Sequence, residues 1–206
     1  MNGVQITTPF EKLEAEEIKN ATKAGVDIKT DVTNDSDTEA TGVSVKSTVY
    51  NKEGDVVSTQ TDDITVAAGK TETISQSVDV ANPKLWSVDS PNLYWVRTEI
   101  IQNGKVVDST DSRFGIRYIA TDPNSGFYLN GVHTKLNGVC EHSDLGSLGM
   151  ETYQAAVDRR IRTLKKYGVN AIRTSHNPVS PEFIEACDRL GMLVFEEAFD
   201  QWLYSK

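Results

Sequence analysis

Cysteine, histidine and long apolar runs are all scarce in this chain of 206 residues. The two cysteines, Cys140 and Cys187, form no Cys-x-x-Cys pair, so the sequence has no redox or metal motif of that kind. One lies in a strand-like run and the other in a helix-like run, and we predict two buried free thiols without a disulfide. Three histidines do not support a histidine-rich metal cluster. No apolar run approaches the roughly 20 residues that span a bilayer.

The opening segment "MNGVQITTPF" has neither the basic region nor the apolar region of a signal peptide. We expect the chain to begin inside a longer protein, which leaves the compartment open between the cytoplasm and the periplasm or secretion. The formal net charge of −9 argues against nucleic acid and anionic membranes as main partners. It is compatible with a neutral small-molecule ligand.

The first part of the chain has the pattern of an all-β domain. Apolar and polar residues alternate from Val26 to Val32 and from Val43 to Val49. Further strand-like runs follow at 64–66, 74–80, 93–101, 106–108 and 114–119, separated by turn signals such as Asn103-Gly104. This spacing is typical of an immunoglobulin-like β-sandwich. We predict that domain over residues 1–121, with residues 1–24 as a lead-in strand or loop.

The pattern changes after a linker that begins at Asp122. Residues 127–129 and 132–139 predict a hairpin that runs into a buried strand, and 169–174 and 192–195 predict two further strands. Apolar residues between 153 and 164 recur at helical spacing, with Gly168 as the stop, and Ser180-Pro181 starts a second helix that ends at Gly191. This β-α-β-α-β order predicts parallel strands joined by right-handed crossovers.

Charged and polar side chains follow all three predicted strands. In parallel sheets the carboxyl ends of the strands meet at one rim, where ligands bind. We therefore predict a ligand site at this rim. Its members are Glu141, His142 and Asp144 after the first strand, Arg173, Ser175, His176 and Asn177 after the second, and Glu196, Glu197, Asp200 and Trp202 after the third.

Several of these residues have two interpretations. Arg173 is either a strand-end arginine paired with a carboxylate such as Glu197 or a cation that orients a catalytic carboxylate. His142 and His176 are either structural or in contact with a ligand. Trp202 is either a platform for stacking a sugar or an aromatic that packs under a lid.

The adjacent pair Glu196–Glu197 has the composition of an acid/base set for cleaving glycosides. Neighbouring residues in a strand point to opposite faces, however, so we do not expect the two carboxylates to share a site. In the sandwich, we interpret Trp86 and Tyr94 as core or seam residues.

Six segments fall in the order and spacing of glycoside hydrolase family 2, which this chain resembles from about Val26 onward. They are "NPKLWSVDSPNLY" (82–94), "RFGIR" (113–117), "GFYLNG" (126–131), "NGVCEHSDLGSLG" (137–149), "AIRTSHNP" (171–178) and "DRLGMLVFEEAFDQW" (188–202). The family includes β-galactosidases, β-glucuronidases and β-mannosidases, and the "EEAFDQW" ending is most similar to the β-galactosidase type.

The resemblance implies a jelly roll, then an immunoglobulin-like sandwich, then a (β/α)8 TIM barrel with the active site. On that plan this chain is the sandwich plus the β-α-β-α-β start of a truncated barrel at 122–206. The family uses two carboxylates in a retaining mechanism, one after the fourth barrel strand and one after the seventh. We therefore expect both to lie beyond this chain, which alone should be inactive.

The resemblance also implies roles for individual residues. His142 and His176 contact the sugar or its transition state, Arg173 orients the nucleophile, and Asp200 and Trp202 help form the sugar pocket. The full set of substrate-binding or supporting residues is His142, Asp144, Arg173, His176, Asn177, Glu197, Asp200 and Trp202.

Two departures from the family bear on the site. Many relatives have a second histidine where Ser143 stands here, and some β-galactosidases bind magnesium where this chain has Gln201 and Leu203. We therefore predict no metal and no cofactor.

The predicted partner is a terminal β-linked sugar or oligosaccharide. Self-association is a further expectation, because a sheet cut from a barrel has an unpaired edge and an uncovered apolar face. The alternatives are a β-glucuronidase- or β-mannosidase-type hydrolase, a non-catalytic carbohydrate-binding module, and a structural sandwich whose rim charges only contact solvent.

Overall fold

The computed structural model describes residues 3–9 and 15–198. Within these ranges the chain forms two compact units. The first extends to Lys84 and resumes at Asn92–Tyr118, and the second consists of Leu85–Pro91 and the residues from Ile119 onward. In the described ranges no helix is both long and apolar enough to cross a membrane.

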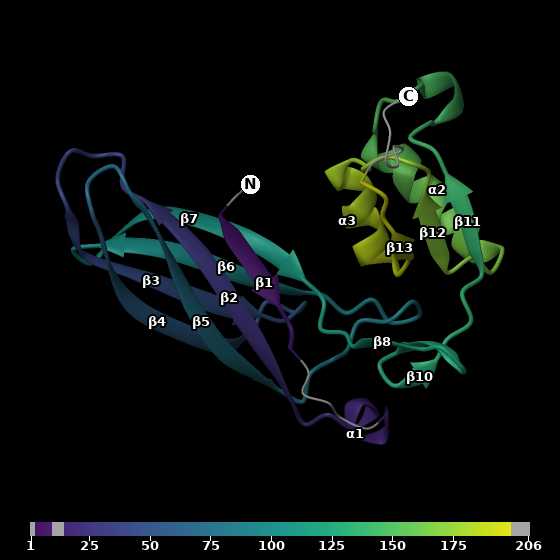
Figure 1. Cartoon of the computed structure of the whole chain (residues 1–206), viewed down its shortest axis with the longest axis horizontal. Helices are drawn as coiled ribbons and strands as arrows, with labels where there is room; N and C mark the ends of the chain where they lie inside the picture. The colour runs from purple at the N-terminus through teal and green to yellow at the C-terminus, as the bar shows by residue number, and fades with distance from the viewer. Residues whose placement is uncertain (1–2, 10–14, 199–206) are drawn as a thin grey trace. The chain divides into compact units, whose positions relative to one another are not determined.

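The first unit is a β-sandwich of two antiparallel sheets (Figure 1). One sheet has the order β1-β2-β5 and the other the order β4-β3-β6-β7. The strands are β1 Val4–Thr7, β2 Lys23–Thr33, β3 Ala40–Tyr50, β4 Val56–Val66, β5 Thr71–Ala81, β6 Tyr94–Gln102 and β7 Lys105–Phe114. The predicted alternation is confirmed, because Val26 and Ile28 of β2 and Val45 and Val49 of β3 are fully buried.

Two predictions for this unit need correction. The stretch 114–119 is no strand, since β7 ends at Phe114 and the next strand starts at Ile119. Ile116 is nevertheless fully buried, so the apolar signal came from an extended segment without a partner strand. The lead-in contains strand β1, paired with β2, and a short helix α1, Ala15–Lys19. A helix of five residues is too short to produce a periodic signal.

The second unit holds two small sheets. An antiparallel sheet of order β10-β9-β8 is followed by a parallel sheet of order β11-β12-β13, with helices in the crossovers. The elements are β8 Ile119–Asp122, β9 Gly126–Leu129, β10 Val132–His133, β11 Gly138–Glu141, the 3-10 turn Gly146–Leu148, α2 Gln154–Lys166, β12 Ala171–Thr174, α3 Pro181–Leu190 and β13 Leu193–Phe195. The predicted parallel β-α-β-α-β arrangement is confirmed.

The ends of the helices follow from local chemistry. The Phe183 backbone N–H donates to the Ser180 hydroxyl at 3.3 Å, and Pro181 occupies the first turn of α3. Gly168 after α2 and Gly191 after α3 have φ of +82° and +77°, a left-handed conformation that favours glycine. A side chain at Gly191 would also collide with the Val88 carbonyl oxygen, so this glycine lets the segment Leu85–Pro91 approach closely.

The helices cover only one face of the parallel sheet. Val139, Ile172 and Val194 are register partners on that face, and they pack against α2 and α3. The register partners on the other face are Cys140, Arg173 and Phe195, and all three are exposed. The rim at which a ligand site was predicted from sequence lies at the carboxyl ends of these strands.

The prediction of two buried thiols is therefore half wrong. Both cysteines are free, and Cys187 on α3 is buried, which raises the pKa of its thiol to about 12. Cys140 is exposed, because it lies on the face that the helices do not cover.

The strand that was predicted to be buried is shorter than expected. It begins at Gly138, and Leu136 before it is 49% exposed.

Candidate functional site

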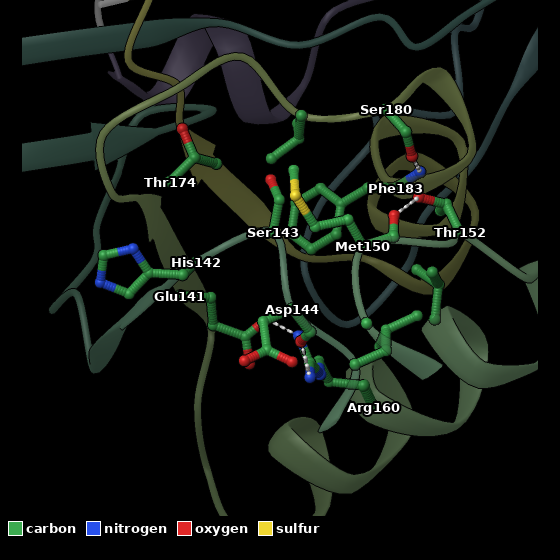
Figure 2. Close-up of a pocket in the computed structure, with 14 residues that line it drawn as sticks. Glu141, His142, Ser143, Asp144, Met150, Thr152, Arg160, Thr174, Ser180 and Phe183 are labelled. Carbon is green, nitrogen blue, oxygen red and sulfur yellow. Dashed lines mark hydrogen bonds and ion pairs between the residues drawn. The ribbon is translucent and has the colours of Figure 1, made fainter. Parts of the chain in front are cut away.

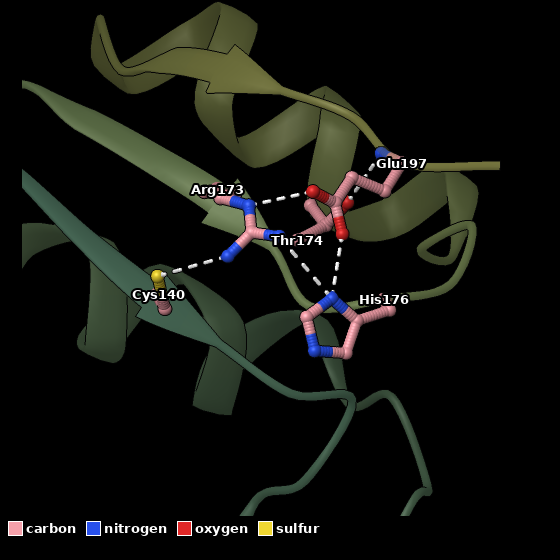
Figure 3. Close-up of polar contacts among 5 residues, drawn as sticks. All are labelled: Cys140, Arg173, Thr174, His176 and Glu197. Atoms are coloured by element: carbon pink, nitrogen blue, oxygen red, sulfur yellow. Dashed lines mark hydrogen bonds and ion pairs between the residues drawn. The ribbon is translucent and has the colours of Figure 1, made fainter. Parts of the chain in front are cut away.

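Arg173 and Glu197 form an ion pair across the ends of β12 and β13 (Figure 3). The Arg173 Nε donates to the Glu197 Oε1 at 2.5 Å. The Glu197 backbone N–H donates to the Thr174 hydroxyl at 2.9 Å, and Thr174 is buried. The backbone at Glu197 is thus anchored to β12. Arg173 is paired with Glu197, and this pair fits both interpretations of the arginine. Its role toward a catalytic carboxylate stays a prediction.

His176 completes this cluster. Its Nδ1 lies 2.8 Å from the Glu197 Oε2 and 3.3 Å from the Arg173 Nη2. Because the carboxylate contact is shorter and charge-assisted, we assign the proton on Nδ1 to the hydrogen bond with Glu197. In the neutral imidazole the other nitrogen, Nε2, is then an acceptor. Figure 3 shows it on the side of the ring turned away from Glu197.

The two partners change the acidity of Glu197. Hydrogen bonds from His176 and from Arg173 lower the pKa of this carboxyl group, so it is ionised at neutral pH. An ionised Glu197 between an arginine and a histidine is a fixed negative charge. The ionised Glu197 carboxylate can therefore hold the Arg173 and His176 side chains in place at the rim.

His142 meets His176 across the rim. Their ring centroids are 6.0 Å apart and the ring planes are at 87°, an edge-to-face contact. The structure thus brings together the strand ends of β11 and β12, as predicted. Both imidazoles are exposed, and so is Asn177, which directly follows His176. These are positions from which side chains can contact a ligand.

Asp144 has a more local role. Its Oδ1 accepts a 2.5 Å hydrogen bond from the Gly146 N–H, which fixes the turn after β11. Asp200 and Trp202 lie outside the described residues, as do Gln201 and Leu203. Among the residues that the structure describes, no group of three or more histidine, cysteine, aspartate or glutamate side chains is placed to hold a metal ion.

The sequence placed Glu141 at the rim, but it did not predict the ion pair of Glu141 with Arg160. The Arg160 Nη1 of α2 lies 3.3 Å from the Glu141 Oε2 at the end of β11 (Figure 2). Burial raises the pKa of Glu141, and the nearby Arg160 opposes that shift. A signal was present in the sequence, because Arg160 stands within the apolar spacing of α2, three residues after Val157 and directly before Ile161.

The fold and the rim define the chain as a sandwich followed by the opening strands of a (β/α)8 barrel with a polar site at the strand ends. Comparisons with known proteins agree. The family model for glycosyl hydrolases family 2 matches residues 10–117, and the model for the TIM barrel domain of the same family matches residues 121–201. The chain belongs to glycosyl hydrolases family 2.

Individual relatives give the same family. The chain is 40% identical over 184 residues to β-galactosidase BoGH2A of Bacteroides ovatus, a match that covers 89% of this chain and 22% of that protein. It is 44% identical over 128 residues to a putative β-glucuronidase of Formosa agariphila, covering 62% of this chain and 12% of that protein.

A solved structure agrees with the fold. A family 2 member from Bacteroides cellulosilyticus has a TM-score of 0.89 at 37% identity, covering 97% of this chain and 26% of that chain. The chain thus spans about a quarter or less of the length of these relatives.

The lowered pKa of Glu197 predicts a pH-dependent stability. A glutamate ordinarily has a pKa of about 4.3. Because the folded-state pKa lies below that value, the contacts of Glu197 stabilise the chain above the ordinary pKa. This contribution is lost as the pH falls through the lowered pKa. Replacing Glu197 with glutamine should therefore lower the urea midpoint at neutral pH, and the deficit should shrink in acid. A deficit that is the same at every pH would contradict this.

Proposed function

We propose that these residues are part of a retaining exo-glycosidase of the β-galactosidase type, which hydrolyses terminal β-linked sugars through a covalent glycosyl-enzyme intermediate. Residues 1–121 are the sandwich domain and residues 122–206 the first part of the catalytic barrel. The observation that carries the proposal is the cluster of Arg173, His176 and Glu197 at the strand ends of a family 2 barrel.

Support for the sugar comes from the relatives. One relative matched over 89% of the chain is a β-galactosidase, and β-glucuronidases are also among the relatives, including a solved structure that covers 95% of the chain.

The proposed mechanism places the described residues around the sugar and not at the bond that breaks. His142 and His176 donate to or accept from hydroxyl groups as charge develops on the ring. Arg173, held by Glu197, reaches the nucleophile and keeps it ionised. Asp144, Asn177, Asp200 and Trp202 complete the pocket. The acid/base and nucleophile carboxylates belong to the part of the relatives that these residues do not cover.

An activity panel tests the proposal. The 206-residue chain should not hydrolyse aryl β-galactosides, β-glucuronides or β-mannosides, whereas the intact protein should hydrolyse the β-galactoside with the largest kcat/KM. Normal turnover by the short chain would place the chemistry within it and overturn the proposal. Saccharide binding without any hydrolysis by the intact protein would favour the carbohydrate-binding module instead.

Self-association of the short chain is also part of the proposal. Its support is the sheet face that the helices leave open, on which Phe195 is 68% exposed. In the intact protein the rest of the barrel would cover this face.

A further inference from the structure

We propose that Arg160, which lines the same pocket as His142 from helix α2 (Figure 2), is a positioning residue that sets His142 at the rim. The inference rests on the proposed function for its catalytic consequence and on the geometry alone for its structural one. Arg160 projects from α2 toward the loop that follows β11, and Figure 2 shows it beside Glu141 and Asp144.

The guanidinium holds the loop at two points. Its Nη1 pairs with the Glu141 carboxylate at 3.3 Å, and its Nη2 donates to the Asp144 backbone carbonyl. Only His142 and Ser143 lie between these points in the sequence. Because both ends of this two-residue segment are fixed to one rigid group on a helix, the direction in which the His142 side chain leaves the backbone is fixed too.

The loop has little support of its own at this point. The Asp144 N–H donates to the His142 carbonyl at 2.7 Å, which makes a tight turn, and the Asp144 side chain faces forward to Gly146. His142 itself is exposed. Its ring is edge-to-face with His176, but a contact between two exposed rings does not hold a loop in place. The Arg160 contacts therefore add side-chain fixed points on both sides of His142.

The Arg160–Glu141 pair is also connected to the end of β12. The Ser175 N–H donates to the Glu141 carbonyl at 2.8 Å, and Ser175 directly precedes His176. Glu141 is thus connected to Arg160 by its side chain and to the turn that carries His176 by its backbone. A change at Arg160 should affect His142 first and His176 less.

Because the Arg160–Glu141 pair is partly buried, its loss should change the position of the loop. The side chains of Arg160 and Glu141 are 29% and 16% exposed. Without the guanidinium, Glu141 is left as a poorly solvated carboxylate whose raised pKa rises further. Fraying of the end of β11 would expose this carboxylate to water, so loss of the guanidinium favours movement of the loop.

The first test uses nuclear magnetic resonance of the histidine rings in the 206-residue chain. Arg160→Met should shift the ring signals of His142 clearly and those of His176 less. Arg162→Met is the matched control, because Arg162 lies on the same helix with a side chain 63% exposed and a 3.8 Å pair to Asp158. That control should leave both rings unchanged. Unchanged His142 signals in a folded Arg160→Met chain would overturn the proposal.

Two further variants keep the test decisive if Arg160→Met does not fold. Arg160→Lys keeps the charge but cannot bridge both acceptors, so His142 signals should still shift. The exchange of Glu141→Arg with Arg160→Glu should restore part of the parent spectrum, because the ion pair re-forms. A double variant no closer to the parent than either single variant would count against the pair as the determinant.

The second test uses the intact protein with an aryl β-galactoside. Arg160→Met should lower kcat/KM by about 10- to 100-fold, since a misplaced contact to the reacting sugar has an effect of that size. Most of the loss should be in kcat. The kcat/KM of Arg160→Lys should lie between the values of the parent protein and of Arg160→Met. If the parent protein hydrolyses no glycoside, the proposed function fails while the ring spectra still decide the positioning role. A shifted His142 with full activity would overturn the catalytic part alone.

Discussion

Replacement of Trp86 with alanine is expected to lower the free energy of unfolding of the second unit by about 3–5 kcal/mol. Trp86 is 1% exposed, and its indole Nε1–H donates to the Asp188 carbonyl of α3 at 2.7 Å. Its own carbonyl accepts a hydrogen bond from the Asn130 side chain at 2.9 Å. The substitution removes a large buried ring and leaves the Asp188 carbonyl without this donor.

The effect should reach beyond one side chain, because Trp86 anchors the whole segment Leu85–Pro91 to the second unit. The Lys165 ammonium donates to the Val88 carbonyl at 2.5 Å and to the Gly191 carbonyl at 2.8 Å. With the Trp86 ring gone, the segment loses its buried anchor, while the polar contacts of Val88 with Lys165 and of the Trp86 carbonyl with Asn130 can remain.

Urea denaturation followed by circular dichroism measures the change. Trp86→Phe is the matched control: it keeps most of the buried ring, removes the N–H donor and should cost about 1–2 kcal/mol. An alanine variant as stable as the phenylalanine variant would mean that ring burial contributes little here.

What the sequence predicted well depends on local chemistry. Helix α3 could be read from Ser180, Pro181 and Gly191, since a cap, a fixed φ and a left-handed glycine act within a few residues. The strands of the sandwich followed from alternation, because one face of each must be buried. The order of the parallel strands followed from the helices between them.

What the sequence did not predict depends on pairings between distant residues. The exposure of Cys140 follows from the helices covering only the opposite face of its sheet. The Glu141–Arg160 pair spans 19 residues and two elements. The burial of Trp86 on α3 joins residues 102 positions apart. The spacing of α2 places Arg160 beside the apolar face of the helix, but a pattern within one element does not say which other element meets it.

The site lies between these two cases. That Arg173, His176 and Glu197 share a rim follows from parallel strand ends, and their predicted positions needed no side-chain detail. Which nitrogen of His176 faces Glu197 could not be predicted, since it depends on a side-chain rotation and a 2.8 Å contact. That orientation decides which nitrogen remains for a ligand.

Replacement of Arg173 with methionine in the intact protein is expected to lower kcat toward an aryl β-galactoside by about 100- to 1,000-fold, the cost of losing one fixed group that stabilises charge at a reacting centre. The Arg173 Nε donates to Glu197, its Nη1 lies 3.7 Å from the Cys140 sulfur, and its side chain is 44% exposed. The matched control is Arg97→Met, which removes an exposed, doubly hydrogen-bonded pair with Asp111 in the sandwich and should leave kcat unchanged.

A second comparison separates the two interpretations of Arg173. If the arginine serves only as the partner of Glu197, then Glu197→Gln and Arg173→Met should lower kcat equally, because each breaks the same pair. If Arg173 orients a catalytic carboxylate, the arginine variant should lose far more, since Glu197→Gln leaves the cation in place and still hydrogen-bonded. Equal losses would assign Arg173 to the structure of the rim, and a larger loss for Arg173→Met would assign it to the chemistry.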